Sequence, residues 1–248
     1  MRIPAEVRLM IYDLLFDDQG AKTFEIRNED PELYKRRKVH ARSSYRVLGR
    51  DLVRQSRPTT YYLVNNVDMC IAIMSVNRKI YEETSHILYT NRTFSFGRDV
   101  EAIVPFFSDV TKHTRPLIRE IAVVKQGSVY SRDNDRCEWQ SVIDFLRESM
   151  QIGSLKLVVE GGRPSLGWEG LPKYSAKDFK TLASVGYEPL EWVWQLLSLK
   201  GLGRLEIGSE IHHCPPSHSN AMAFFAAFSA SIETGFSEFL RSELLCRA

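Results

Sequence analysis

The sequence is poor in cysteine and lacks a long apolar run. Its 248 residues include four cysteines, which lie far apart and form no Cys-x-x-Cys pair. This spacing indicates reduced thiols rather than a disulfide framework. No segment holds the ~20 consecutive apolar residues that a membrane-spanning helix needs, and the charged N-terminal segment does not resemble a secretory signal. We therefore expect an intracellular protein, cytoplasmic or nuclear or both, with no membrane partner.

Motifs of the common enzyme classes are also missing. The sequence contains no Gly-x-Ser-x-Gly and no His-Glu-x-x-His, and its glycines at residues 161–170 match neither dinucleotide-binding nor P-loop spacing. Residues 212–219 contain the zinc-type ligands His212, His213, Cys214 and His218. Adjacent ligands followed by two prolines match no standard zinc site, so we interpret this segment as a polar connecting loop. We expect no enzymatic activity, no cofactor and no metal.

Charge is distributed unevenly along the chain. The net charge is only +2, yet residues 34–57 alone carry +8, so the rest of the chain carries −6. The basic patch that we predict in this segment comprises Lys35, Arg36, Arg37, Lys38, Arg42 and Arg46. A helix over residues 42–54 would align its arginines on one face. A nucleic-acid-associated nuclear factor is therefore an alternative function, although no base-reading motif accompanies the charge.

The N-terminal residues predict a helix. Pro4 and Glu6 suit the first turn of a helix that begins there. Apolar residues then recur at helical spacing, namely Ile3, Val7, Met10, Ile11, Leu14 and Leu15. Residues 75–91 predict a second helix, which Ser75 would cap, and residues 23–27 and 92–96 alternate like short strands.

A helix-then-strand unit recurs in the second half of the chain. Residues 99–107, 138–150 and 189–199 have helical patterns, and each is followed by a short strand rich in Leu, Ile and Val, at 117–124, 154–160 and 203–209. Such alternation predicts parallel strands with helical crossovers. The spacing is too irregular for a strict leucine-rich repeat. We therefore predict an α/β fold of irregular, degenerate leucine-rich-repeat-like units.

Two further segments complete this half. Residues 161–175 are rich in Gly and Pro and predict an exposed loop, in which Trp168 and Tyr174 could anchor a partner or fold back on the core. The last segment predicts one amphipathic helix, whose stripe is Phe225, Phe228, Ile232, Phe236 and Phe239.

Two stretches of the sequence match known patterns: "IPAEVRLMIYDLL" matches most of L-P-x-E-I-R-x-x-I-Y-x-x-L-L, and "NRKIYEETSHILYTNRTFSF" matches most of C-R-Q-I-Y-x-E-A-x-x-I-L-Y-x-x-N-T-F-x-F. These are the opening pattern and the second signature of fungal F-box-like proteins, which the chain therefore resembles. The matching residues include Pro4, Glu6, Arg8, Tyr12, Arg78, Tyr81, Glu83, Tyr89, Phe94 and Phe96. The resemblance covers about the first half of the chain.

The resemblance implies a non-enzymatic protein–protein interaction module. It would be a substrate-recognition or scaffolding subunit of a ubiquitin ligase that contacts a Skp-type adaptor. We expect an F-box-like helical portion over residues 1–96, with the basic insertion at about 34–57, packed on a repeat-like α/β region over 97–248, or one continuous domain. The adaptor side of the first helix would be Ile3, Pro4, Val7 and Met10. Alternatively, this helix is purely structural.

Overall fold

The computed structural model describes residues 3–16, 22–29, 43–48, 54–64, 71–126, 139–165, 170–215 and 219–245. The helices are α1 (Ala5–Phe16), α2 (Arg78–Thr90), α3 (Ile103–Asp109), α4 (Trp139–Ser149), α5 (Ala176–Ser184), α6 (Glu191–Leu196), α7 (Asn220–Ser231) and α8 (Ser237–Leu244). Short 3₁₀ turns are η1 (Ile71–Ser75), η2 (Val100–Ala102), η3 (Arg115–Leu117) and η4 (Glu188–Leu190), and η5 (Ile232–Phe236) is a π-helical turn. The strands are β1 (Thr23–Glu29), β2 (Ser43–Leu48), β3 (Arg54–Leu63), β4 (Thr93–Gly97), β5 (Glu120–Lys125), β6 (Ser154–Pro164) and β7 (Arg204–Cys214).

The strands form one mixed, mostly parallel sheet in the order β2-β3-β1-β4-β5-β6-β7. Strands β1, β4, β5, β6 and β7 run parallel to one another, whereas β3 pairs antiparallel with both β1 and β2. The α/β class with parallel strands and helical crossovers is thus confirmed. The predicted strand at 23–27 is β1, and the recurring units at 99–124, 138–160 and 189–209 give β5, β6 and β7.

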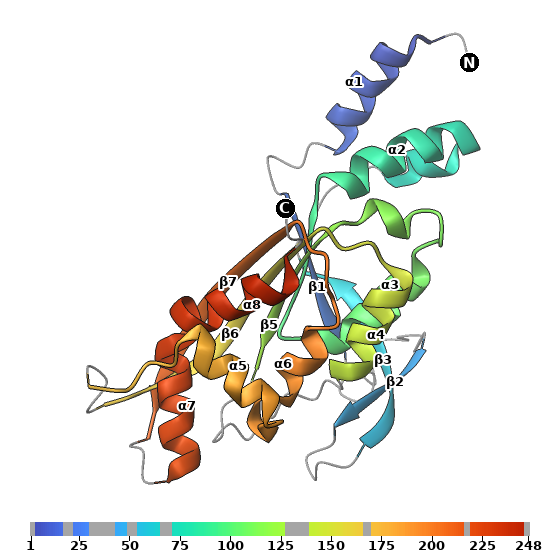
Figure 1. Ribbon diagram of the computed structural model, residues 1–248. Coiled ribbons are helices and arrows are strands. Elements are labelled where there is room, and N and C mark those ends of the chain that lie inside the picture. The colour runs from blue at the N-terminus through green and yellow to red at the C-terminus, as the bar shows by residue number, and fades with distance from the viewer. Residues whose placement is uncertain are drawn as a thin grey trace.

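The crossover helices gather on one face of the sheet (Figure 1). Because β4 to β7 follow one another in both sequence and space, right-handed crossovers place their helices on the same side. Burial alternates accordingly along β5, where Ile121, Val123 and Lys125 are buried and Glu120 is only half-buried. We call the face opposite these helices the open face.

The core continues across the whole described chain. One cluster of buried apolar residues runs from Tyr12 in α1 to Leu244 in α8. Aromatic rings fill its two ends. Phe94, Phe96 and Phe107 make tilted contacts around α3, and a second group around α5 and α8 makes stacked and edge-on contacts and includes Phe179, Phe228, Phe236 and Phe239. The sheet and the core therefore join the two regions, 1–96 and 97–248, that the sequence distinguishes.

The start of the second helix differs from the prediction. Residues Ile71–Ser75 form the turn η1, and Asn77 is the N-cap of α2 because its side-chain oxygen accepts a hydrogen bond from the Ile80 amide at 3.0 Å. Ser75 does not cap α2. Both residue types cap helices well, so local sequence alone did not distinguish them.

Two segments predicted as loops are partly strand. β6 continues through Gly161 and Gly162 to Pro164, and it pairs with β7 as far as Cys214. The predicted loop at 161–175 therefore begins four residues too early, and His212 to Cys214 do not lie in a connecting loop. Added side chains at Gly161 and Gly162 would collide with Ile211 and Phe225, so glycine there permits close packing rather than a turn.

Two other segments also differ from the prediction. Residues 43–48 and 54–63 pair as the antiparallel strands β2 and β3, so the helical alignment of arginines does not form. The C-terminal helix has its whole predicted stripe buried, but it is not continuous. Thr234 has φ −112° and ψ −105°, and the π-helical turn around it separates α7 from α8. Among the described helices, none combines the length and apolar character required to cross a membrane.

Candidate functional site

Helix α1 is attached to α2 by a polar anchor. The Arg8 guanidinium donates from Nε and Nη2 to both carboxylate oxygens of Glu83, at 3.0 and 2.6 Å. The Tyr12 hydroxyl donates to the same carboxylate at 3.0 Å, and Arg8 Nη1 also donates to the Ile3 carbonyl at 2.7 Å. One carboxylate thus fixes two successive turns of α1, and the guanidinium fixes the residue that precedes the helix. We call Arg8, Tyr12 and Glu83 the anchor.

The anchor alters the ionisation of its members. The hydrogen bonds from Arg8, followed by that from Tyr12, lower the pKa of Glu83 from 4.5 to about 2. The hydrogen bond to Glu83 raises the pKa of Arg8, and burial raises the pKa of the Tyr12 hydroxyl. The Arg8 side chain is 8% exposed and the Glu83 side chain 24% exposed. The ion pair therefore persists at neutral pH, and it is partly shielded from water.

The opposite face of α1 is apolar and exposed. Val7, Met10 and Leu14 are 44%, 65% and 77% exposed, and Ile3, just before the helix, is 47% exposed. At 100° per residue these side chains lie on the side of α1 opposite Arg8, Tyr12 and Phe16, which are buried. We call Ile3, Val7, Met10 and Leu14 the outer stripe. Three of the four residues expected on the adaptor side, Ile3, Val7 and Met10, belong to it, and Pro4, the fourth, is also exposed.

The anchor joins the two stretches that carry the F-box-like resemblance. Arg8 and Tyr12 match the first pattern, and Glu83 matches the second. Figure 1 shows α1 lying beside α2 at one end of the molecule, away from the sheet. The main-chain carbonyl of Phe16 also accepts a hydrogen bond from Arg92, at 2.7 Å, just after α2. The helices of the two stretches therefore pack together despite the residues between them.

The aromatic residues predicted for a capture loop are only partly described. Trp168 lies outside the described residues. Tyr174 is half-buried, packs on Phe179 and Phe224 with ring centroids 5.8 and 5.6 Å apart, and its amide donates to Ser231 Oγ. In the structure Tyr174 therefore packs against the C-terminal helices.

The predicted basic patch lies largely outside the described residues. Lys35, Arg36, Arg37, Lys38 and Arg42 all fall in the undescribed range 30–42. Arg46 lies in β2, where its backbone pairs with Ser56, and its side chain is outside the described part. Nucleic-acid binding by this segment stays a prediction.

The histidine and cysteine residues at 212–214 diverge in space. Cys214 is buried, and burial raises the pKa of its thiol, whereas His212 and His213 are exposed. His212 instead approaches Glu210 at 3.4 Å, near Glu160. Arg98 bridges both carboxylates, at 2.6 Å to Glu160 and 2.8 Å to Glu210. A guanidinium therefore already pairs with both carboxylates of this cluster on the open face.

The open face of the sheet is polar. Its middle carries a hollow of about 350 Å³, to which Thr93, Ser95, Glu120, Lys156 and Glu206 contribute. Fully parallel sheets usually bury both faces. The open face is consequently a second broad surface available for contact with another molecule.

Comparison of this chain with protein-family models, with curated proteins and with solved structures finds no match. The functional argument therefore rests on the chain's own side chains. Among the described residues, the outer stripe on its anchored helix is the clearest candidate docking surface.

Proposed function

We propose that the protein is a non-enzymatic protein–protein interaction module in which the outer stripe of α1 docks a partner. The observation that carries this proposal is that one face of α1 is bound to the rest of the protein while the opposite face is apolar and exposed. One face is held by the anchor to Glu83, and the other presents Val7, Met10 and Leu14 to solvent. An apolar patch of this kind typically marks an interaction site.

A helix already held in place is well suited to docking. Association is weakened when a flexible segment must be ordered, because binding then has to offset the lost conformational entropy. The anchor removes part of that cost by fixing α1 on α2 in the free protein. The partner would lay its own apolar groove on the outer stripe, which is the helix-in-groove mode of recognition.

The resemblance of both stretches to fungal F-box-like proteins suggests the partner and the role. We propose a Skp-type adaptor as the partner, which would make this chain a substrate-recognition or scaffolding subunit of a ubiquitin ligase. The region after residue 97 would then present degenerate leucine-rich-repeat-like units to a second protein. The consecutive order of β4 to β7, with helices on one face and an open face opposite, supports the description of this region as repeat-like.

Binding of a purified Skp-type adaptor tests the proposal. Val7→Asp and Met10→Asp each place a carboxylate in the outer stripe, and both should abolish adaptor binding while leaving the melting temperature nearly unchanged. Leu9→Asp is the matched control, because Leu9 is 44% exposed on the same helix but lies outside the stripe. It should bind like the wild type.

Three results would contradict the proposal. They are wild-type protein that does not bind the adaptor, stripe variants that bind as the wild type does, and stripe variants that lose binding because the whole chain unfolds. The last result would support the alternative in which α1 is purely structural.

A further inference from the structure

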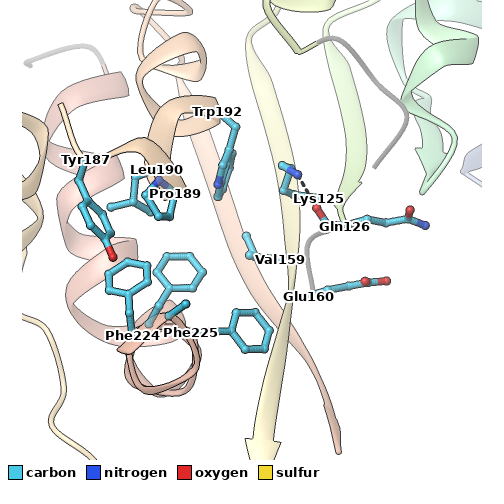
Figure 2. A pocket seen from close by; sticks show the side chains of 12 residues that line it. Lys125, Gln126, Val159, Glu160, Tyr187, Pro189, Leu190, Trp192, Phe224 and Phe225 are labelled. Atoms are coloured by element: carbon cyan, nitrogen blue, oxygen red, sulfur yellow. Dashed lines mark hydrogen bonds between the residues drawn. The ribbon is translucent and has the colours of Figure 1, made fainter. Parts of the chain in front are cut away.

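An apolar pocket lies beside the end of β5 and the middle of β6, next to the first turns of α7 (Figure 2). Its volume is about 190 Å³. Phe224, Phe225 and Phe228 of α7 form one wall. Tyr187 and Trp192 come from the segment around η4 and α6, and the Tyr187 ring packs edge-on against that of Phe224 at 4.7 Å. Because β6 continues past Glu160 to Pro164, the pocket lies against the helix-covered face of the sheet.

One buried cation forms part of the pocket wall. Lys125, the last residue of β5, is only 8% exposed. Its ammonium lies 5.6 Å from the ring centroid of Trp139 and 5.5 Å from that of Trp192, and it donates a hydrogen bond to the Gln126 carbonyl. Two cation–π contacts and a hydrogen bond hold the charge in a fixed place.

The other polar residues of the pocket turn away from its apolar walls. Figure 2 shows the side chains of Gln126 and Glu160 extending to the side away from Phe224 and Tyr187. The Glu160 carboxylate is bonded to Arg98 at 2.6 Å. Among the lining residues, Lys125 therefore brings its charge beside an aromatic ring of the pocket, that of Trp192.

We propose that this pocket binds a small aromatic carboxylate. An apolar cavity of about 150 Å³ is known to hold a benzene molecule, so this volume accommodates one ring with a short acidic arm. The ring would lie among the aromatic side chains of Trp192, Phe224 and Phe225, where offset and edge-on contacts are favourable. The carboxylate would lie beside Lys125, because ionic hydrogen bonds are strong where water is excluded.

This inference does not rest on the docking function proposed for α1. Helix α1 and the α7 end of the sheet lie at opposite ends of the molecule in Figure 1. The two proposals are tested with different ligands and different variants, so the failure of one leaves the other standing.

Calorimetric titration of the full chain with phenylacetate tests the pocket. Phenylacetamide is the matched neutral probe, since it keeps the ring and replaces the carboxylate by an amide. We expect saturable binding of phenylacetate at millimolar concentration, at least about tenfold tighter than that of phenylacetamide, as is typical for a hydrogen bond to a charged group. Lys125→Met keeps the length and apolar contacts of the side chain, and it should reduce phenylacetate affinity to that of the amide.

Lys156→Met is the control variant, because Lys156 is an exposed lysine of β6 on the open face; it should bind phenylacetate like the wild type. The proposal is overturned if wild-type protein shows no saturable phenylacetate binding, or binds acid and amide equally. It is also overturned if folded Lys125→Met binds as tightly as the wild type. Should that variant fail to fold, the comparison of the two probes on the wild type still decides the question.

Discussion

Arg8 and Glu83 lie 75 residues apart in the sequence and form a two-point ion pair, with donor–acceptor distances of 3.0 and 2.6 Å. The bidentate geometry specifies both the position and the rotation of α1 on α2. It turns Arg8, Tyr12 and Phe16 inward, so the outer stripe must point away from the rest of the protein. This ion pair, together with the Tyr12 hydrogen bond and the buried Phe16 ring, therefore sets which face of the first helix is free to bind.

Breaking the anchor should release α1 without unfolding the sheet. Arg8→Met and Glu83→Gln each remove one charge of the pair, and we expect faster hydrogen exchange of the α1 amides in both variants, with unchanged protection in β5 and β6. Arg78→Met is the control, because its ion pair with Glu82 is on the surface of α2, with the arginine side chain 92% exposed. Unchanged exchange of α1 in both anchor variants would show that apolar packing alone holds the helix.

The anchor should also weaken in acid. The pKa of Glu83 is about 2 in the folded protein, below its ordinary value of 4.5, chiefly because of the Arg8 hydrogen bonds. The stabilisation is therefore complete above about pH 4.5 and is lost as the pH falls towards 2. Carbon-13 NMR of the Glu83 carboxyl group should report the low pKa in the wild type and a value closer to the ordinary one in Arg8→Met. A midpoint near 4.5 in the wild type would contradict the anchor geometry.

The two faces of α1 should respond differently to substitution. Leu14→Asp alters a residue that is 77% exposed, so the free energy of unfolding should change by no more than about 0.5 kcal/mol. Phe16→Ala removes a ring that is 2% exposed, and it should reduce the opening free energy of α1 by about 3 kcal/mol. Native-state hydrogen exchange measures both quantities. Equal effects of the two substitutions would mean that α1 lacks a distinct outer face.

Periodicity predicted most of the helices and parallel strands because each buries one regular face. The outer stripe shows the limit of this signal, since Ile3, Val7 and Leu14 have the spacing of a core-facing helix but are exposed. The inward side chains Arg8 and Tyr12 are polar, and the distant Glu83 supplies the carboxylate that both of them bind. Long-range pairing of this kind leaves no periodic trace in the sequence.

The aromatic pocket was not predicted, although part of its signal was present. In β5 the residues at alternate positions, Ile121, Val123 and Lys125, share the buried face. A lysine at the end of such an alternation indicates a buried charge that needs partners. Its aromatic partners are Trp139 at the start of α4 and Trp192 in α6, and only the folded chain brings them together.

Gly161 and Gly162 of β6 favour a loop by sequence, because glycine weakens a strand and commonly marks a turn. Here glycine is required by close packing instead. The Gly162 amide donates to Ser229 Oγ at 2.9 Å, and an added Cβ at this position would lie 2.4 Å from Phe225 Cε1 and 2.9 Å from the Cys214 side chain. Helix α7 thus packs directly on the backbone of β6.

Gly162→Ala should therefore destabilise the protein by about 1–3 kcal/mol, the usual range for overpacking a tight core. Gly208→Ala is the matched control in the neighbouring strand β7, because the nearest atom to its added Cβ is Val158 Cγ2 at 3.9 Å, an ordinary contact. With no clash to relieve, that variant should unfold at the same urea concentration as the wild type or at a slightly higher one, since alanine restricts the unfolded chain more than glycine does.

A second substitution identifies the clash as the cause. Phe225→Leu shortens the side chain that an alanine at position 162 would strike, so the double variant Gly162→Ala/Phe225→Leu should lose less stability than the two single variants added together. Urea unfolding of the four proteins gives this coupling energy. Additive losses would show that the cost of Gly162→Ala arises elsewhere, in the strand backbone or at the Cys214 side chain. A loss smaller than that sum would support close packing of α7 on β6, which the aromatic wall of the pocket requires.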